Sequence, residues 1–340
     1  TVQRRGAVML KRGLGLLGIS VLSATGALAC EGKDVALQIV AEEVTLTPDT
    51  LDGVRIEGAW ELTSPDPSFG GFSGLVVASG HDGSAEGDGL RGFVAIGDRG
   101  LSMIGVYRTD RADCIIEALT NEQLLDLNRE ALSGDAADAE ALAAGPGAGL
   151  LIAFERDHRI QHLTHDGVAS VLADPSFATL PFNAGLEALA IVPEGVDGAG
   201  DVIAIAEGAD ADGFPAFRIA GGVEGGASAV ETRLTLPGPH RVTGADIGAD
   251  GTLYLVRRHY DPLIGVDIVI EAMPLPALFA PDAAAATRRL ARFGPESGID
   301  NMEAIAVSRL GVDETRLTLI SDDNFSNDQR TLLLELRLTE

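Results

Sequence analysis

Carboxylates recur at one position of a repeated sequence pattern. The pattern is an apolar residue, then Ser, Thr or Glu, then Gly or Ala, then mostly apolar residues. The second positions, which lie 67, 47, 56 and 60 residues apart, are Ser73, Glu140, Glu187, Thr243 and Glu303. Glutamate is disfavoured inside a strand, and several glutamates around one axis repel one another unless a cation lies among them. Such hard oxygen ligands favour Ca²⁺ over Zn²⁺, although each Glu could instead accept a hydrogen bond from the neighbouring repeat.

A second set of charges ends the next apolar segment of each repeat. The set comprises Asp98, Arg99, Glu155, Arg156, Glu207, Arg257, Arg258, Asp322 and Asp323. Carboxylates beside arginines place ligands for a cation near donors for an oxyanion, and recognition of a phosphate or carboxylate ester requires that mixture. Salt bridges between neighbouring repeats are the alternative explanation for each pair.

The densest polar cluster is SDDNFSNDQR, at residues 321–330. Its oxygen-rich residues Asp322, Asp323 and Asn324 are predicted calcium ligands, and Arg330 is a predicted oxyanion donor. The spacing differs from that of an EF-hand loop, which also needs a glycine at its sixth position.

Short strands must position these residues. A second apolar strand follows each repeated pattern after 14 to 25 residues, and a third strand follows the second. Units of three or four short strands repeated in this way are typical of propeller blades. We therefore predict an all-β propeller with five visible blades, whose ring is closed by residues 54–62 pairing into the last blade. Residues 35–47 could form a sixth, degenerate blade, and the insertion 121–132 and the Ala-rich segment 281–292 are candidate helices.

The N-terminal segment has the layout of a signal peptide. Lys11 and Arg12 precede an apolar run over 14–21 and then small residues up to Ala29, as in exported proteins. The run is too short to span a bilayer, so we expect no transmembrane segment in the mature chain. Cleavage after residue 29 would leave residues 30–340 as one propeller domain that is periplasmic or secreted.

The two cysteines, Cys30 and Cys114, are expected to form a disulfide, because paired cysteines in an oxidising compartment are usually bonded. A lipid anchor on Cys30 is the second interpretation. The formal net charge of −26 argues against nucleic acid and anionic membranes as partners. We expect a monomer that acts on a small molecule.

Several segments together resemble the bacterial phytase-like family, which is named for an esterase-like activity of phytase. They are FGGFSGL with GFVAIGDRG, DAEALA with LLIAFERDHRI, NAGLEALAI, GTLYLVRRHYD, and DNMEAIAV with LISDDNFSNDQRTLLL. The resemblance covers about residues 54–338, and its C-terminal block is the most specific part. It implies a β-propeller, usually secreted or periplasmic, with esterase-like or phytase-like activity. This chain has Glu-Ala in blade openings where many relatives have Glu-Gly.

The main hypothesis is a calcium-assisted hydrolase of phosphate monoesters or related esters. Its catalytic candidates are Glu187, Glu303, Arg99, Arg156, Arg257 and Arg330. Its metal-ligand candidates are Glu140, Glu187, Glu303, Asp98, Glu155, Glu207, Asp322, Asp323 and Asn324. A non-catalytic binding or scaffold propeller is the first alternative, and a lactonase-like or serine esterase is the second. Ser73 lacks the glycine spacing of a nucleophile elbow, and His158, His162 and His165 do not share a face of a strand.

Overall fold

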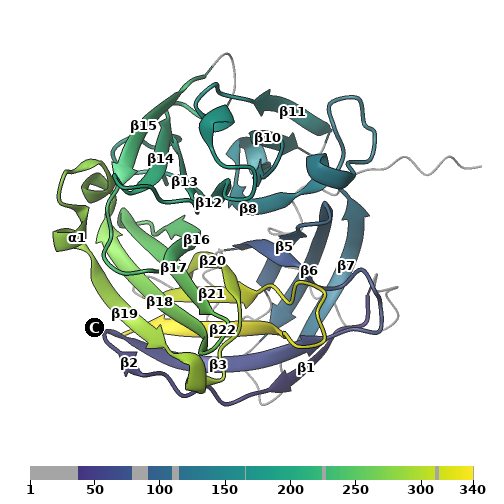
Figure 1. Ribbon diagram of the computed structural model, residues 1–340. Coiled ribbons are helices and arrows are strands. Elements are labelled where there is room, and N and C mark those ends of the chain that lie inside the picture. The colour runs from purple at the N-terminus through teal and green to yellow at the C-terminus, as the bar shows by residue number, and fades with distance from the viewer. Residues whose placement is uncertain are drawn as a thin grey trace, which may run out of the picture.

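Five antiparallel sheets surround one axis as the blades of a β-propeller (Figure 1). The computed structural model describes residues 37–78, 91–108, 115–164, 166–223, 227–310 and 314–339. The predicted five-bladed, all-β fold is therefore confirmed. In every blade the repeated sequence pattern forms the first, innermost strand.

The first three blades each contain four strands taken in sequence order. Blade 1 comprises β4 (Phe72–Val77), β5 (Arg91–Gly97), β6 (Leu101–Arg108) and β7 (Ile115–Gln123). Blade 2 comprises β8 (Ala139–Ala144), β9 (Leu150–Phe154), β10 (Arg159–Thr164) and β11 (Gly167–Leu172). Blade 3 comprises β12 (Leu186–Ile191), β13 (Val202–Ala206), β14 (Phe214–Ile219) and β15 (Ala229–Leu234).

The last two blades each gain strands from the N-terminal part of the chain. Blade 4 comprises β16 (Arg241–Ile247), β17 (Thr252–Asp261), β18 (Gly265–Pro274), β19 (Arg288–Phe293) and β2 (Thr50–Leu51). Blade 5 comprises β20 (Met302–Leu310), β21 (Glu314–Ser321), β22 (Thr331–Leu338), β3 (Val54–Thr63) and β1 (Val40–Glu43).

The ring closes where β3 pairs with β22, with Trp60 opposite Leu333. This confirms the prediction that residues 54–62 complete the last blade. The suggested sixth blade is wrong for the described residues, because β1 pairs with β3 at the edge of blade 5 and Leu37 bridges to Ala118 of blade 1. One terminus completes the sheet that the other begins, which removes two free strand edges.

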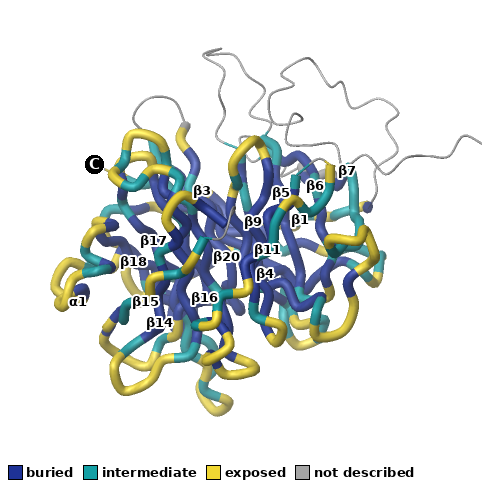
Figure 2. Tube along the Cα trace, turned by 90° about the horizontal axis from the view of Figure 1, so that it is seen from above, coloured by how far each residue is buried: buried dark blue, intermediate teal, exposed yellow. Residues whose placement is uncertain are grey.

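Small and apolar side chains allow the inner strands to approach closely. β4, β8, β12, β16 and β20 pack against one another around the axis, and buried residues fill the centre of the molecule while the exposed ones lie on the loops and outer strands (Figure 2). The residue after the repeated Ser, Thr or Glu is always small, namely Gly74, Ala141, Ala188, Gly244 and Ala304. A larger side chain would separate neighbouring blades.

The described helices are all short. The 3₁₀ helices are η2 (Gly134–Ala137), η3 (Pro146–Ala148), η4 (Phe177–Thr179), η5 (Leu275–Phe279) and η6 (Pro295–Ser297), and α1 is a single turn (Ala283–Ala286). The helix expected over 281–292 is therefore mostly wrong, because Arg288–Phe293 forms β19 instead. Pairing with β18 outweighs the weak helical propensity of a short alanine run. The helix expected over 121–132 is also wrong, because β7 extends to Gln123 and the next helix, η2, begins only at Gly134. No helix among the described residues is long and apolar enough to cross a membrane.

Candidate functional site: an acidic ring at the mouth of the propeller

A β-bulge occurs at the same repeat position in all five blades. The register between the first and second strands shifts around one residue per blade: Ser73, Glu140, Glu187, Thr243 and Glu303. A bulged residue leaves the ladder and its side chain can be re-aimed. The five residues predicted to be equivalent are thus equivalent in register as well as in sequence. We call them the bulge ring.

A second set of equivalent residues follows the second strand in four blades and, in blade 4, lies at the same register within the longer strand β17. Its members are Asp98, Glu155, Glu207, Arg258 and Asp322, which we call the strand-end ring. In four blades the backbone N–H of this residue donates to the carbonyl oxygen two residues before the bulge: Asp98 to Gly71 (3.1 Å), Glu155 to Asp138 (2.8 Å), Glu207 to Gly185 (3.0 Å) and Asp322 to Asn301 (2.9 Å). In blade 4 the equivalent pair is Arg258 opposite Arg241. Both rings therefore lie at one end of the inner strands, which we call the mouth.

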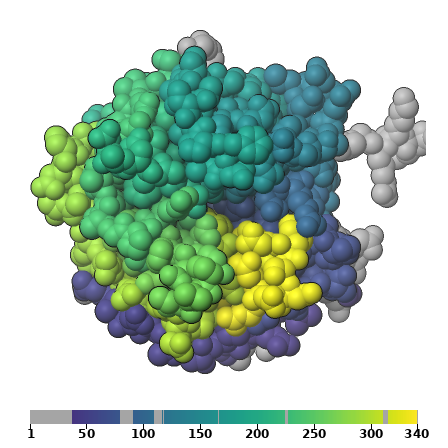
Figure 3. Space-filling view, in the orientation of Figure 1, coloured from purple at the N-terminus to yellow at the C-terminus, as the bar shows by residue number. Residues whose placement is uncertain are grey.

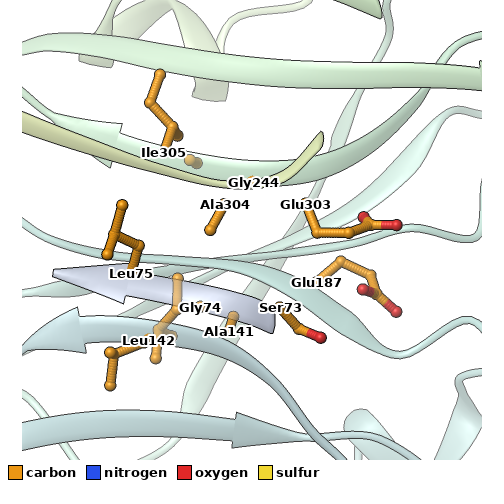
Figure 4. A pocket seen from close by; sticks show the side chains of 12 residues that line it. Ser73, Gly74, Leu75, Ala141, Leu142, Glu187, Gly244, Glu303, Ala304 and Ile305 are labelled. Atoms are coloured by element: carbon orange, nitrogen blue, oxygen red, sulfur yellow. The ribbon is translucent and has the colours of Figure 1, made fainter. Parts of the chain in front are cut away.

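The channel below the mouth is nearly closed. Leu75, Leu142 and Ile305 line it beneath the glutamates, and the carboxyl groups of Glu187 and Glu303 project toward the same end as Ser73 (Figure 4). About 10 Å³ remains inside this lining, which is room for about one water molecule. A ligand larger than a water molecule would therefore have to bind at the mouth. Figure 3 views this face, where the C-terminal residues border a central hollow.

The glutamates of the bulge ring are ionised with difficulty. Burial raises the pKa of Glu140 and of Glu187 well above the usual range, and the surrounding carboxylates raise both further. Burial also raises the pKa of Glu303 to about 8, although Arg258 opposes this. Without a compensating cation these groups therefore retain protons that exposed carboxyls lose.

Carboxyls around the ring show the same effect. Burial raises the pKa of Asp322 to about 7 and that of Asp138 to about 6, with neighbouring carboxylates adding to each shift. Burial also raises the pKa of Asp98, against the attraction of Arg99 and Arg156. A group of carboxyls whose pKa values are all raised marks this place as a candidate functional site.

Three carboxylates of blade 2 lie close together. Ligand oxygens of Asp138, Glu140 and Glu155 all lie within 4.8 Å of one another, so these three residues could hold a metal ion. Asp138 follows the short helix η2, and Glu155 Oε1 accepts a hydrogen bond of 3.0 Å from the backbone N–H of Gly185. Sequence reasoning missed Asp138, although its place two residues before the bulge could have revealed it.

Several buried oxygens at the mouth have no hydrogen-bond partner among the described residues. They are Oε2 of Glu303, Oδ1 of Asp98 and Oδ1 of Asn301. An unpaired buried carboxylate oxygen is costly, and Ca²⁺ takes six to eight oxygen ligands of this kind. These oxygen atoms are therefore suitable ligands for a hard cation. Asn301 was also absent from the sequence-based candidates.

Arginines lie on two sides of the acidic ring. Arg258 Nη2 is 3.1 Å from Glu207 Oε1, and Arg258 Nε is 3.4 Å from Glu303 Oε1. Arg156 Nε is 3.1 Å from Asp138 Oδ2. These guanidinium groups compensate part of the negative charge and could contact an anionic ligand.

Arg99 and the C-terminal loop form another side of the mouth. The Arg99 guanidinium stacks 3.3 Å from the ring centroid of Phe325. Asp323 Oδ1 accepts hydrogen bonds from the backbone N–H of Gly71 (2.9 Å) and of Phe325 (3.0 Å), and its Oδ2 accepts one from Thr331 Oγ1 (3.2 Å). Asp323 thereby fixes the loop. Asn324 is exposed and its N–H donates to Asp322 Oδ1 (2.6 Å).

Two predicted oxyanion donors lie away from the ring. Arg257 is buried inside blade 4, where it bonds Glu271 (2.9 Å) and the carbonyl oxygens of Pro237 and His240. Successive side chains of a strand face opposite ways, so its neighbour Arg258 reaches the ring instead. Arg330 donates to the carbonyl oxygen of Gly298 (2.6 Å) and holds the C-terminal loop.

Ser73 has no catalytic partner among the described residues. It is buried on β4, whereas the histidines bond elsewhere: His158 contacts the Pro181 carbonyl oxygen (3.1 Å) and His240 contacts Asp267 (3.3 Å). His165, Cys30, Cys114 and the proposed signal peptide lie outside the described residues.

Comparison with known proteins gives one family. The model of the phytase-like family, described as "Esterase-like activity of phytase", matches residues 67–325. No curated protein matches the chain. Among solved structures, an α-L-arabinofuranosidase from Podospora anserina is 8% identical over 89% of this chain and 98% of its own, with a TM-score of 0.44. Virginiamycin B lyase from Staphylococcus aureus is 9% identical over 89% and 100%, with a TM-score of 0.38. Neither likeness is close enough to transfer a function.

Proposed function

Because this chain belongs to the phytase-like family, we propose that it is a calcium-assisted hydrolase of phosphate monoesters or related esters. The observation that carries this proposal is the cluster of carboxylates at the mouth, in which Glu303 Oε2 is buried and has no hydrogen-bond partner among the described residues. Such oxygens need either protons or a cation. The family is described by an esterase-like activity. We therefore favour a cation that takes part in hydrolysis.

The metal would be held by carboxylates of both rings together with Asp138. Glu140, Glu187 and Glu303 approach from the inner strands, and Asp98, Asp138, Glu155 and Asp322 surround them. A bound Ca²⁺ would supply Lewis-acid polarisation of the ester and would lower the pKa of a water molecule. Glu187 and Glu303 would hold that ion in position. Arg258 compensates part of the negative charge of Glu303.

The arginines would bind the oxyanion of the substrate. Arg258 and Arg156 already lie beside carboxylates of the mouth, and Arg99 is exposed against Phe325. Guanidinium groups bind phosphate or carboxylate oxygens in a bidentate manner. No covalent intermediate is required, because the nucleophile is water.

Metal analysis of the purified protein, followed by phosphatase and carboxylesterase assays with and without chelator, tests the proposal. We expect bound calcium and a chelator-sensitive hydrolysis. Glu303→Gln should weaken calcium binding and lower kcat together, whereas Ser73→Ala should retain activity. Glu194→Gln, at an exposed loop position, is the matched control.

Two outcomes would redirect the proposal. Tight calcium binding without hydrolysis of any ester would favour a binding propeller. An inactive Ser73→Ala variant, together with indifference to chelator, would favour a serine esterase.

We also propose that the chain works outside the cytoplasm as a monomer, after removal of residues 1–29, with Cys30 and Cys114 bonded. The signal-like order of charged, apolar and small residues supports export. N-terminal sequencing of the exported protein and thiol titration test this. A start other than residue 30, or two free thiols in the native protein, would contradict it.

A further inference from the structure

Blade 4 breaks the acidic symmetry of the mouth. Where the other blades place Asp or Glu in the strand-end ring, blade 4 places Arg258. Its bulge residue is Thr243, whose hydroxyl is buried and donates to the Met302 carbonyl oxygen (2.9 Å). Blade 4 therefore contributes no carboxylate to either ring. A ligand can approach the ring with least repulsion from this side.

A pocket opens at the same place. Its volume is about 430 Å³, and its lining is Glu207, Pro239, Arg241, Arg258, His259 and Tyr260. The hairpin of β17 and β18 forms one wall, since β17 continues past Arg258 to Asp261. The pocket is large enough for part of a small-molecule ligand, unlike the channel below the ring.

Two guanidinium groups in this pocket are held by one carboxylate. Arg241 Nη1 is 3.1 Å from Glu207 Oε2, and Arg258 Nη2 is 3.1 Å from Glu207 Oε1. Each arginine therefore uses one terminal nitrogen on Glu207. The side chain of Arg241 is 55% exposed, and among the described residues Glu207 is its one ion-pair partner. The Nε of Arg258 is buried and lies 3.4 Å from Glu303 Oε1, so Arg241 presents the more accessible guanidinium group to the pocket.

We propose that Arg241 and Arg258 form an anion-binding subsite on blade 4, which holds a negatively charged oxygen group of a ligand beside the acidic ring. Among the residues that line the pocket, two arginines lie beside one carboxylate, so the lining has a net positive charge, although Arg258 also contacts Glu303 of the acidic ring. Fixed guanidinium groups lose little freedom when they bind an oxyanion. The part of this subsite in catalysis rests on the proposed hydrolase function, but its binding of an anion does not.

Isothermal titration of the calcium-treated protein with inorganic phosphate is the direct test, and acetate serves as a carboxylate comparison. Arg241→Gln should weaken phosphate binding at least tenfold, and Arg241→Lys should restore part of the affinity. Because Arg241 is mostly exposed, the fold should persist. Arg233→Gln is the matched control, since Arg233 is also partly exposed (37%) and is ion-paired with Asp210 and Glu231 of blade 3.

Kinetics separate this inference from the proposed function. For an anionic ester, Arg241→Gln should raise KM at least tenfold and leave KM for a neutral ester unchanged. If the protein hydrolyses no ester but Arg241→Gln still weakens phosphate binding, the subsite stands and the hydrolase proposal fails. If the protein is an active hydrolase whose phosphate affinity and KM are the same in Arg241→Gln, the subsite is overturned. Equal losses in Arg233→Gln would likewise overturn it, because the effect would then be general surface charge.

Discussion

At the scale of single residues, the carboxyl groups of the mouth make the free energy of unfolding depend on pH. Glu303 has a pKa of about 8 and Asp322 one of about 7, against ordinary values of 4.5 and 3.8. Both carboxyls bind protons more tightly in the folded protein than in the unfolded chain. Their contribution to metal-free stability is therefore fully present below about pH 4 and is lost as the pH rises through 7 and 8.

We expect the metal-free protein to lose stability between pH 5.5 and pH 8. Each unit of pKa shift corresponds to about 1.4 kcal/mol, so the loss should reach a few kcal/mol. Thermal unfolding with chelator at both pH values measures it, and calcium should restore Tm at pH 8. Glu303→Gln should flatten the pH dependence, because Gln does not ionise. A chelated wild-type protein that is more stable at pH 8 than at pH 5.5 would contradict this.

Calcium binding should release protons at pH 7. The ion favours the charged carboxylates, so it displaces protons that Glu303 and Asp322 hold in its absence. Affinity should rise by up to about tenfold per pH unit for each proton released, and level off above pH 8. Calorimetry in buffers of different ionisation enthalpy counts the protons. An affinity that is constant from pH 6 to pH 8 would show that these carboxyls are not the ligands.

At the scale of elements, the bulges depend on close contact between inner strands. A methyl group on Gly244 would lie 2.8 Å from the carbonyl oxygen of Glu303 and 3.3 Å from Cα of Ala304. These are backbone atoms that cannot rotate away. Glycine in a strand often marks such an approach of another backbone. The position of Glu303 therefore depends on a residue of the neighbouring blade.

Gly244→Ala should destabilise the protein by about 1–3 kcal/mol, as overpacking does, and should weaken calcium binding by moving Glu303. Chemical unfolding and calcium titration measure the two effects. Ala188→Gly, at the same repeat position of blade 3, is the control, because it removes a methyl group and creates no clash. Unchanged calcium affinity in Gly244→Ala would mean that the bulge tolerates a shift of β16.

At the scale of the whole molecule, a buried ion cluster joins the first blade to the last. Glu335 of β22 accepts from Arg91 of β5 (3.1 Å) and from Arg316 of β21 (2.7 Å). Tyr107 of β6 also donates to Glu335 (3.3 Å). The cluster lies between blades 1 and 5, where the chain closes on itself. Both arginine side chains are 9% exposed, so water compensates them poorly.

Glu335→Ala should therefore destabilise the ring by about 3–5 kcal/mol, which is typical when one partner of a buried ion pair is removed. Urea unfolding monitored by circular dichroism measures the loss. Glu314→Gln is the control, because the Glu314–Arg337 pair is partly exposed and should contribute less than about 1 kcal/mol. Equal effects of the two variants would show that closure does not depend on the buried cluster.

The sequence alone was sufficient for the architecture. Five copies of one pattern, each followed by further strands, predicted five blades, and the unpaired residues 54–62 predicted how the ring closes. Repetition makes this possible, because aligned repeats show which positions are equivalent even when the distances between them are unknown. It also identified the bulge ring and included all five residues of the strand-end ring among the charged strand ends, although it chose Arg257 and not Arg258 as the oxyanion donor.

Only the tertiary structure decided which charged side chains face the axis. Arg257 and Arg258 are adjacent in sequence, yet one is buried against Glu271 and the other contacts Glu207 and Glu303. Asp138, Asn301 and Arg241 share the repeat position two residues before the bulge, but their place beside the strand-end ring follows from pairing with a strand that lies further along the chain. A strand exposes alternate residues to opposite sides, and a bulge shifts that alternation by one. Long-range pairing, which sequence order does not contain, therefore determines the membership of the site.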